Sequence, residues 1–167
     1  PAPAAPPAAV PAPDAAALAA ATSRLYVTNE QAGTLTVIDT NTRAVVGTFP
    51  LGKRPRGISV SPDGARLYVA LSGSPIGGPG VDESKLPPAD KTADGIGVID
   101  ARTGALLKVL PSGSDPETVA VAKDGRHVFV ANEDTGQASM VDVNDGTILA
   151  SIKIGEEPEG TARSEEH

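Results

Sequence analysis

"RLYVTNEQAGTLTVIDTNTRAVVGTFPLGKRPRGISVSPDGARLYVA", residues 24–70, contains one motif twice. RLYV stands at 24–27 and again at 66–69, which is 42 residues later. A related tetrapeptide, HVFV, follows at 127–130. A fixed spacing between similar segments is the sequence signature of a repeat architecture, so the rest of the chain must be tested for the same period.

Two further sets of markers repeat with the same spacing. The first set is VID at 37–39, VID at 98–100 and MVD at 140–142; the second is RPRG at 54–57, DPET at 115–118 and EPEG at 157–160. In both sets the first interval is 61 residues and the second is 42. The unit is therefore 42 residues, and one copy is longer by 61 minus 42, or 19 residues.

Each unit reads as four short strands separated by Gly, Asp and Asn turns. The expected strands are GISVS (57–61), ARLYVA (65–70), TLTVIDT (34–40) and AVVGTFPL (44–51). Alternating apolar and small residues, rich in β-branched side chains, are typical of strands. Four strands in about 40 residues is the period of a β-propeller blade, so the sequence predicts an all-β fold of four-stranded antiparallel meanders.

These motifs resemble a known family. LYVTN at 25–29, together with SPDG, VID and G-x-x-P-x-G, is similar to the YVTN family of bacterial β-propeller repeats, and the resemblance covers residues 24–160. Some related propellers accompany periplasmic alcohol oxidation by pyrroloquinoline quinone enzymes, and ALSGSPIGGPGVDESKLPP (70–88) is similar to that subgroup. Other related propellers include surface-layer proteins and the heavy subunit of methylamine dehydrogenase.

The sequence predicts three segments and about three blades. We expect a Pro/Ala-rich tether at 1–23, with a short helix in 14–21 capped by Asp14. Blades follow at 24–52, 55–113 (with an insertion at 72–94) and 115–155, and then a truncated tail at 161–167. The first unit lacks its first strand. The family usually has about seven blades, so we expect an incomplete propeller: either a fragment, or a chain whose copies associate to complete a ring.

The composition argues against several classes of function. The formal net charge of −7 and the absence of a basic face argue against nucleic-acid binding. There is no cysteine, which excludes disulfides and thiol chemistry, and no apolar run long enough to span a membrane. The chain starts at Pro1 with a Pro/Ala run, as expected of a product processed after export. We therefore predict a bacterial periplasmic or extracellular protein.

The long insertion points to a binding face. In a meander, the turn after the second strand and the link after the fourth strand lie at the same end of the blade, so the insertion shares a face with the inter-blade links. Long loops on one face of a repeat array usually form its binding face. The charged candidates on this face are Lys53, Arg54, Arg56, Asp82, Glu83, Lys85, Asp115, Glu117, Glu133, Asp134, Glu157 and Glu159. Two alternatives stay open: a lid that only covers small apolar side chains, and an ordinary solvated rim.

Signals for a cofactor or for catalysis are weak. Glu30, Glu133 and Asp134 could offer oxygen ligands to Ca²⁺, but their spacing does not require it. DVNDG at 142–146 reads better as a turn than as a calcium loop. His127 begins a strand and His167 ends the chain, and neither forms a recognisable catalytic pair. Tyr26, Tyr68 and Phe129 share one repeat position, which indicates core packing.

The sequence therefore favours a non-catalytic exported scaffold without a bound cofactor. It would bind a protein partner or a small ligand on the face that carries the links and the insertion, as an accessory to periplasmic quinone-dependent oxidation. Because tryptophan is absent, the chain is not expected to bind the quinone itself. The alternatives are a fragment or subunit of a propeller enzyme, of the lyase or amine dehydrogenase type, and a surface-layer repeat.

Overall fold

The computed structural model describes residues 13–78 and 80–164 and is built almost entirely of β-strands. One short helix, α1 (Ala15–Ala20), precedes the strands. The strands in chain order are β1 (Arg24–Asn29), β2 (Thr34–Asp39), β3 (Ala44–Pro50), β4 (Pro55–Val60), β5 (Arg66–Leu71), β6 (Gly95–Asp100), β7 (Leu106–Leu110), β8 (Pro116–Val121), β9 (His127–Asn132), β10 (Gln137–Asp142) and β11 (Ile148–Lys153).

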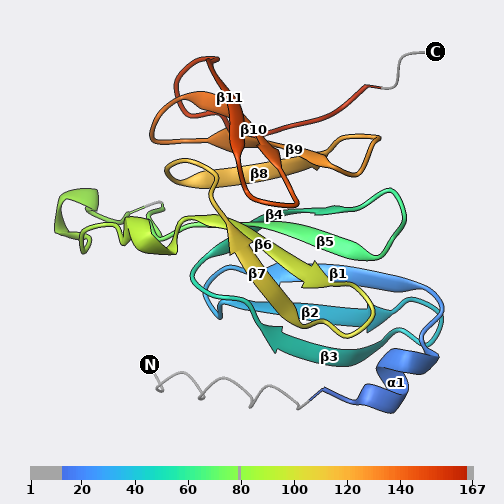
Figure 1. The fold of residues 1–167 in the computed structure, drawn as a ribbon. Helices are drawn as coiled ribbons and strands as arrows, with labels where there is room; N and C mark the ends of the chain where they lie inside the picture. The colour runs from blue at the N-terminus through green and yellow to red at the C-terminus, as the bar shows by residue number, and fades with distance from the viewer. Residues whose placement is uncertain (1–12, 79, 165–167) are drawn as a thin grey trace, which may run out of the picture.

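The strands form three antiparallel sheets that stack one beside the next (Figure 1). The first sheet has the order β1-β2-β3, the second β4-β5-β6-β7 and the third β8-β9-β10-β11. Each sheet is a meander of neighbouring strands, as the repeat predicted. Among the residues that the structure describes, the first sheet has no counterpart of β4 or β8, as expected for a first unit that lacks its first strand. The prediction of an all-β array of about three blades, an incomplete propeller, is confirmed.

Apolar side chains join the sheets face to face. One core cluster lies between the first and second sheets and includes Leu35, Val37 and Leu67, all with 0% exposure. A second cluster lies between the second and third sheets, where Ile96 and Val130 are equally buried. Small aliphatic residues suit this packing, because facing sheets approach closely and exclude water.

The Asp of each VID-like motif forms the turn that follows its strand. Asp39 Oδ1 accepts hydrogen bonds from the backbone of Asn41 and Thr42, and Asp100 Oδ1 does the same from Arg102 and Thr103. Asp142 completes the set by accepting from Asn144. These aspartates are turn-forming acceptors, and DVNDG is the expected turn, in which Gly146 has a φ of 78°.

The three links between blades share an unusual backbone conformation. The residue before each link proline has a positive φ, namely 39° at Arg54, 53° at Asp115 and 47° at Glu157. Non-glycine residues rarely adopt this region, which favours Gly and Asn. Pro55 and Pro116 are then fully buried at the start of β4 and β8. The sequence contains no sign of the positive φ at the residue in front of each proline.

The predicted short helix is present. Asp14 is the N-cap of α1, and its carboxylate accepts from the backbone nitrogens of Ala16 and Ala17, each at 3.0 Å. Leu18 is 5% exposed and packs into the first core cluster. The part of the predicted tether at 1–12 lies outside the described residues, as do residues 165–167 of the tail. Among described helices, none is long and apolar enough to cross a membrane.

Candidate functional site

The insertion leaves β5 and returns to β6 at the end of the second sheet where the link enters β4. Pro55 pairs with Leu71 across β4 and β5, so the link and the insertion begin side by side. The insertion contains two short 3-10 helices, Glu83–Lys85 and Lys91–Ala93. It projects from the body of the molecule (green and yellow-green in Figure 1). We call this end of the blades the link face.

The base of the insertion is fastened to the first two blades. The backbone N–H of Gly73 donates to Asp94 Oδ1 at 2.7 Å, and the N–H of Asp90 donates to the carbonyl of Gly73 at 2.9 Å. Lys53, from the first link, pairs with Asp90 at 2.6 Å. These contacts hold both ends of the insertion against the link that precedes β4.

The same segment reaches the third blade. Asp94 is buried, and its Oδ2 accepts from the backbone N–H of Asp115 at 3.0 Å. Lys91 pairs with Asp134, which also accepts from the hydroxyl of Ser114 at 2.7 Å. The insertion therefore contacts links or loops belonging to all three blades.

Two buried arginines form the centre of the link face. The side chains of Arg54 and Arg56 are only 15% and 14% exposed. Arg54 pairs with Glu30 at 2.6 Å, and Arg56 pairs with Glu133 at 2.8 Å and with Glu117. Neighbouring links therefore pair their charges. Such burial is not that of an ordinary solvated rim.

Asp115 lies beside both arginines. Its Oδ1 is 3.5 Å from Arg56 Nη1 and 4.0 Å from Arg54 Nη1, and it also accepts a hydrogen bond from the buried hydroxyl of Ser72. The side chain is 7% exposed. Buried charges are stable only when paired and hydrogen-bonded, and here cations and carboxylates of three blades pair with one another, although Glu117 Oε2 has no hydrogen-bond partner among the described residues.

Two recesses open beside this charge cluster. One, of about 550 Å³, lies between the insertion and the third blade and is bounded by Arg54, Ser74, Lys91, Asp115 and Glu133. The other, of about 460 Å³, lies between the insertion and the first link, with Glu30, Lys53 and Asp90 on its wall. Both are within the size range of small-molecule sites; the first is lined mainly by polar groups, and the second has more apolar surface.

The remaining predicted residues lie apart from the cluster. Asp82 and Lys85 pair with each other at 2.9 Å on the exposed part of the insertion, and Glu83 belongs to the same turn. Glu157 is exposed in the third link. Glu159 is exposed too, but it lines a separate recess with Thr28, Arg56 and Glu117. The structure therefore brings together seven of the twelve: Lys53, Arg54, Arg56, Asp115, Glu117, Glu133 and Asp134.

Sequence reasoning missed the residues that anchor the insertion. Asp90, Lys91 and Asp94 lie within the predicted insertion but were not singled out. A local signal existed at Asp90, whose carboxylate caps the second 3-10 helix by accepting from the backbone N–H of Thr92. Such a capping pattern is recognisable in sequence, whereas the contacts across blades are not.

The carboxylates considered for Ca²⁺ are engaged with cations. Glu30, Glu133 and Asp134 pair with Arg54, Arg56 and Lys91. Within residues 13–78 and 80–164, no three His, Cys, Asp or Glu side chains are grouped as metal ligands would be. His127 lies at the opposite end of its blade, with Nδ1 2.6 Å from Asp124, and His167 is outside the described residues.

The stacked meanders define a β-propeller protein, and comparisons with solved structures agree. The chain is similar to hydrazine synthase of Kuenenia stuttgartiensis, with a TM-score of 0.63 and 22% identity over 82% of this chain and 34% of that one. It is similar to a putative 6-phosphogluconolactonase of Bacteroides fragilis, with a TM-score of 0.55 and 20% identity over 79% of this chain and 36% of that one. It is also similar to the dihydro-heme d1 dehydrogenase NirN in complex with DHE, with a TM-score of 0.54 and 20% identity over 86% and 28%.

These likenesses show the fold alone. The chain spans about a third of the length of the solved structures it matches. No protein-family model and no curated protein matches it. The resemblance to the YVTN family, and to its quinone-associated subgroup, therefore stays a prediction.

The Lys53–Asp90 pair predicts how the stability of the insertion depends on pH. The hydrogen bond from Lys53 lowers the pKa of Asp90 from 3.8 to about 2. Because the pKa is lower in the folded state, this pair stabilises the insertion above about pH 4 and is lost as pH falls through about 2. In Lys53→Met we expect the pKa of Asp90 to rise toward 3.8, as measured by NMR titration of its carboxyl carbon. The pKa of Asp82, which pairs with Lys85 instead, serves as the internal control and should not move.

Proposed function

We propose that this chain is part of a non-catalytic β-propeller that binds a small polar ligand on its link face. The ligand would lie in the recess between the insertion and the third blade. The observation that carries the proposal is this recess of about 550 Å³, where charged groups from three blades converge beneath a loop unique to one of them.

The lining suggests the chemistry of the ligand. Asp115, Glu133 and Asp134 contribute three carboxylates, against the two cations Arg54 and Lys91. The cations are already paired, so the groups left to a ligand are mainly carboxylate oxygens with spare acceptor positions. A ligand with several hydroxyl or amino donors fits this wall best. A catalytic role is not favoured, since no histidine among the described residues lies on this face.

A glycine substitution tests whether the insertion forms the site. A Cβ on Gly73 would lie 1.7 Å from the carbonyl oxygen of Asp90, so Gly73→Ala must push the insertion away from the link. We expect the sheets to stay folded, because Gly73 lies outside the strands. The insertion should become the first segment cut in limited proteolysis. Gly160→Ala is the matched control, because nothing lies within 4 Å of its added Cβ.

The binding experiment is a thermal-shift screen with polyols, sugars, polyamines and amino alcohols, followed by calorimetric titration of any compound that stabilises the protein. We expect a stabilising compound from these classes, no stabilisation of Gly73→Ala, and normal binding to Gly160→Ala. Binding that is equal in the wild type and Gly73→Ala would place the site elsewhere. Stabilisation by none of these donor-rich classes would argue against the proposal.

A protein partner is a second candidate, favoured by apolar residues on the insertion itself. Ile76 and Val81 are 36% and 44% exposed on the projecting insertion. Exposed apolar side chains on a projecting loop are a common feature of docking sites. Cross-linking from a cysteine placed at Lys85 would capture such a partner from native cells, and Lys123→Cys, on another turn, would be the control.

We also propose that the protein works outside the cytoplasm, as an accessory to quinone-dependent oxidation. The support is the acidic, cysteine-free composition, the Pro/Ala-rich start and the resemblance of residues 70–88 to the quinone-associated propellers. Fractionation of native cells should place the protein in the periplasm or medium. Recovery in the cytosolic fraction would contradict the proposed location. It would have no bearing on the ligand site, which the thermal-shift screen tests separately.

A further inference from the structure

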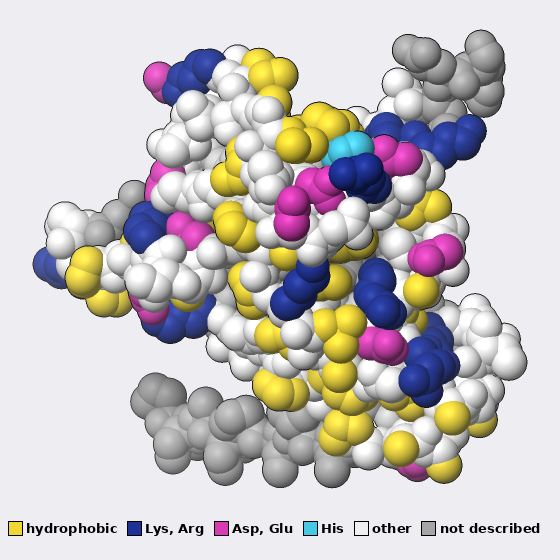
Figure 2. Space-filling view, in the orientation of Figure 1, with side chains coloured by type: hydrophobic (Ala, Val, Ile, Leu, Met, Phe, Trp, Pro, Cys, Tyr) yellow, Lys and Arg dark blue, Asp and Glu magenta, His cyan; other side chains and the backbone are white. Residues whose placement is uncertain are grey.

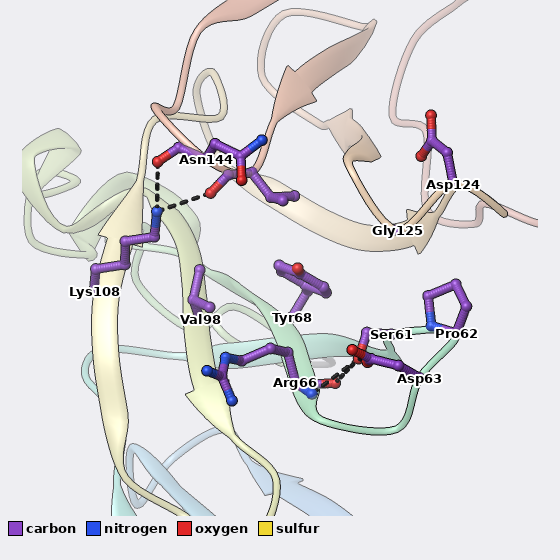
Figure 3. Close-up of a pocket in the computed structure, with 11 residues that line it drawn as sticks. Ser61, Pro62, Asp63, Arg66, Tyr68, Val98, Lys108, Asp124, Gly125 and Asn144 are labelled. Atoms are coloured by element: carbon purple, nitrogen blue, oxygen red, sulfur yellow. Dashed lines mark hydrogen bonds between the residues drawn. The ribbon is translucent and has the colours of Figure 1, made fainter.

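A cavity of about 470 Å³ lies between the second and third sheets, at the end of the blades opposite the insertion. It is distinct from the link face. Its floor is Tyr68, and Arg66, Lys108 and Asn144 surround it (Figure 3). The space-filling view shows charged side chains close together on the surface along this junction, with hydrophobic side chains among them (Figure 2). The repeat allows this cavity to be compared with the equivalent junction between the first and second sheets.

The first junction is closed by two side chains that share one acceptor. The hydroxyl of Tyr26 donates to the carbonyl oxygen of Ala101 at 3.0 Å. Arg24 Nη1 donates to the same oxygen at 2.8 Å. Both residues lie on β1, and Ala101 follows β6, so these bonds tie the first blade to the second.

At the second junction, the equivalent backbone carbonyl accepts its hydrogen bond from a different residue. Tyr68 is the counterpart of Tyr26, and Val143 is the counterpart of Ala101, each 42 residues later. The carbonyl of Val143 accepts from Lys108 Nζ at 2.8 Å. Lys108 pairs with Val98 as Gly47 pairs with Val37, so it stands where the first blade has a glycine without a side chain.

This exchange leaves the hydroxyl of Tyr68 without a partner. Tyr68 is 3% exposed, its ring packs in the second core cluster, and no other described residue makes a hydrogen bond with its hydroxyl. Although the ring is buried, the hydroxyl is not sealed from the cavity, so it can donate to a molecule that occupies it. Burial also raises the pKa of Tyr68, so the group keeps its proton and remains a donor at neutral pH.

The donors and acceptors around the cavity are unequally satisfied. Arg66 makes its hydrogen bonds to Ala65 and Asp100 through Nη1 alone, which leaves its other N–H groups to the cavity. Lys108 gives two of its three hydrogens to Val143 and Asn144. On the acidic side, Asp63 already accepts from Ser61 and Ala65, and Asp124 accepts from the backbone nitrogens of Arg126 and His127 and pairs with the His127 ring. The spare capacity of the wall is therefore that of donors.

The lining also has an apolar part. Val98, Val143 and Pro62 border the cavity beside the ring of Tyr68. The volume falls within the range of ligand sites, roughly 300–1,000 Å³, and exceeds what one or two bridging waters would need. A wall with spare donors beside apolar side chains matches a molecule that has an anionic acceptor group and a hydrocarbon body.

We propose that this inter-blade cavity binds a small organic carboxylate, whose oxygens accept from the Tyr68 hydroxyl, Arg66 and Lys108 while its apolar part lies against Val98 and Val143. The site is independent of the link face, and it exists because Lys108 replaces glycine in the second blade. The first blade, with Tyr26 and Arg24 already bonded to Ala101, has no equivalent.

The test uses benzoate as the probe and NMR of the uniformly labelled chain as the readout. We expect saturable shifts at the Tyr68 ring and at the amides of Val143 and Asn144, with a dissociation constant of about 1 mM or below for so small a ligand. Tyr68→Phe should weaken binding by about tenfold, as expected for a lost hydrogen bond to a charged group. Tyr26→Phe is the matched control and should bind benzoate like the wild type.

A second variant keeps the test decisive in case the side chains around residue 68 rearrange in Tyr68→Phe. In Lys108→Gly the carbonyl of Val143 is released, and we expect the Tyr68 hydroxyl to donate to it, as Tyr26 does to Ala101, with loss of benzoate binding. Benzamide, which has the same shape without the charge, should bind at least tenfold more weakly in every form. Equal binding of benzamide, equal binding to Tyr68→Phe, or the absence of saturable shifts at the cavity would each overturn the proposal.

Discussion

Replacing Arg56 by alanine is expected to destabilise the protein by about 3 kcal/mol, because it leaves buried carboxylates without a cation. Arg56 pairs with Glu117 and Glu133 and lies 3.5 Å from Asp115. The side chains of Asp115 and Glu117 are 7% and 15% exposed, so water replaces the lost partner poorly. Removing one member of a buried charge cluster costs more than the cluster contributes as a whole, since the others stay desolvated.

Urea denaturation followed by circular dichroism measures this loss. The midpoint should fall with little change in the slope, which would show that the folded and unfolded states expose the same surface as before. Arg56→Lys should give an intermediate loss, because an ammonium keeps the charge but offers a poorer geometry to several carboxylates. Lys53→Ala is the control: its side chain is 60% exposed, and its loss should stay within about 0.5 kcal/mol. A loss below about 1 kcal/mol for Arg56→Ala would show that the cluster is far better hydrated than its burial indicates.

The second large loss of stability is expected for Leu67→Ala, and Leu25→Ala in the same chain is its matched control. The two leucines occupy the same repeat position, 42 residues apart. Leu67 is fully buried between the first and second sheets, whereas Leu25 is 50% exposed on the free face of the first sheet. Leu67→Ala should cost about 3 kcal/mol through lost burial and the cavity left behind. Leu25→Ala should cost no more than about 0.5 kcal/mol.

Urea denaturation of Leu67→Ala and Leu25→Ala under identical conditions shows whether sequence context or burial determines the loss of stability. The local sequence around both residues is RLYV, so strand propensity is the same. If the two substitutions cost the same, contacts between neighbouring sheets would not be the main source of stability. A larger loss at Leu25 than at Leu67 would also show that its free face is covered in solution.

The repeat made the fold predictable, because three marker sets with common spacings also fix the strand order. It further predicted that the insertion and the links lie at one end, since a meander allows no other arrangement. The pairing of Arg56 with Glu117 was not predictable in the same way. That contact joins two links 61 residues apart in the repeat and depends on the angle between blades, which no local pattern encodes.

Other features escaped prediction for local reasons. The positive φ occurs at Arg54 and Glu157, which have no preference for that conformation, and at Asp115, which tolerates it better, so tertiary packing rather than local propensity sets it. The anchors Asp90, Lys91 and Asp94 lie in a segment without periodicity. The unpartnered hydroxyl of Tyr68 depends on Lys108, a residue on a different strand, and becomes visible only when two junctions are compared.

The anchored insertion has a mechanical consequence. Its base is bonded to Lys53 before β4, to Asp115 before β8 and to Asp134 after β9. A force that pulls the blades apart at this end must therefore stretch these polar bonds together before the apolar cores can separate. At the opposite end, single side chains bond to backbone carbonyls across the junctions, from Arg24 and Tyr26 to Ala101 and from Lys108 to Val143 and Asn144, and no ion pair joins the described blades there. Under load we therefore expect the blades to separate first at that end.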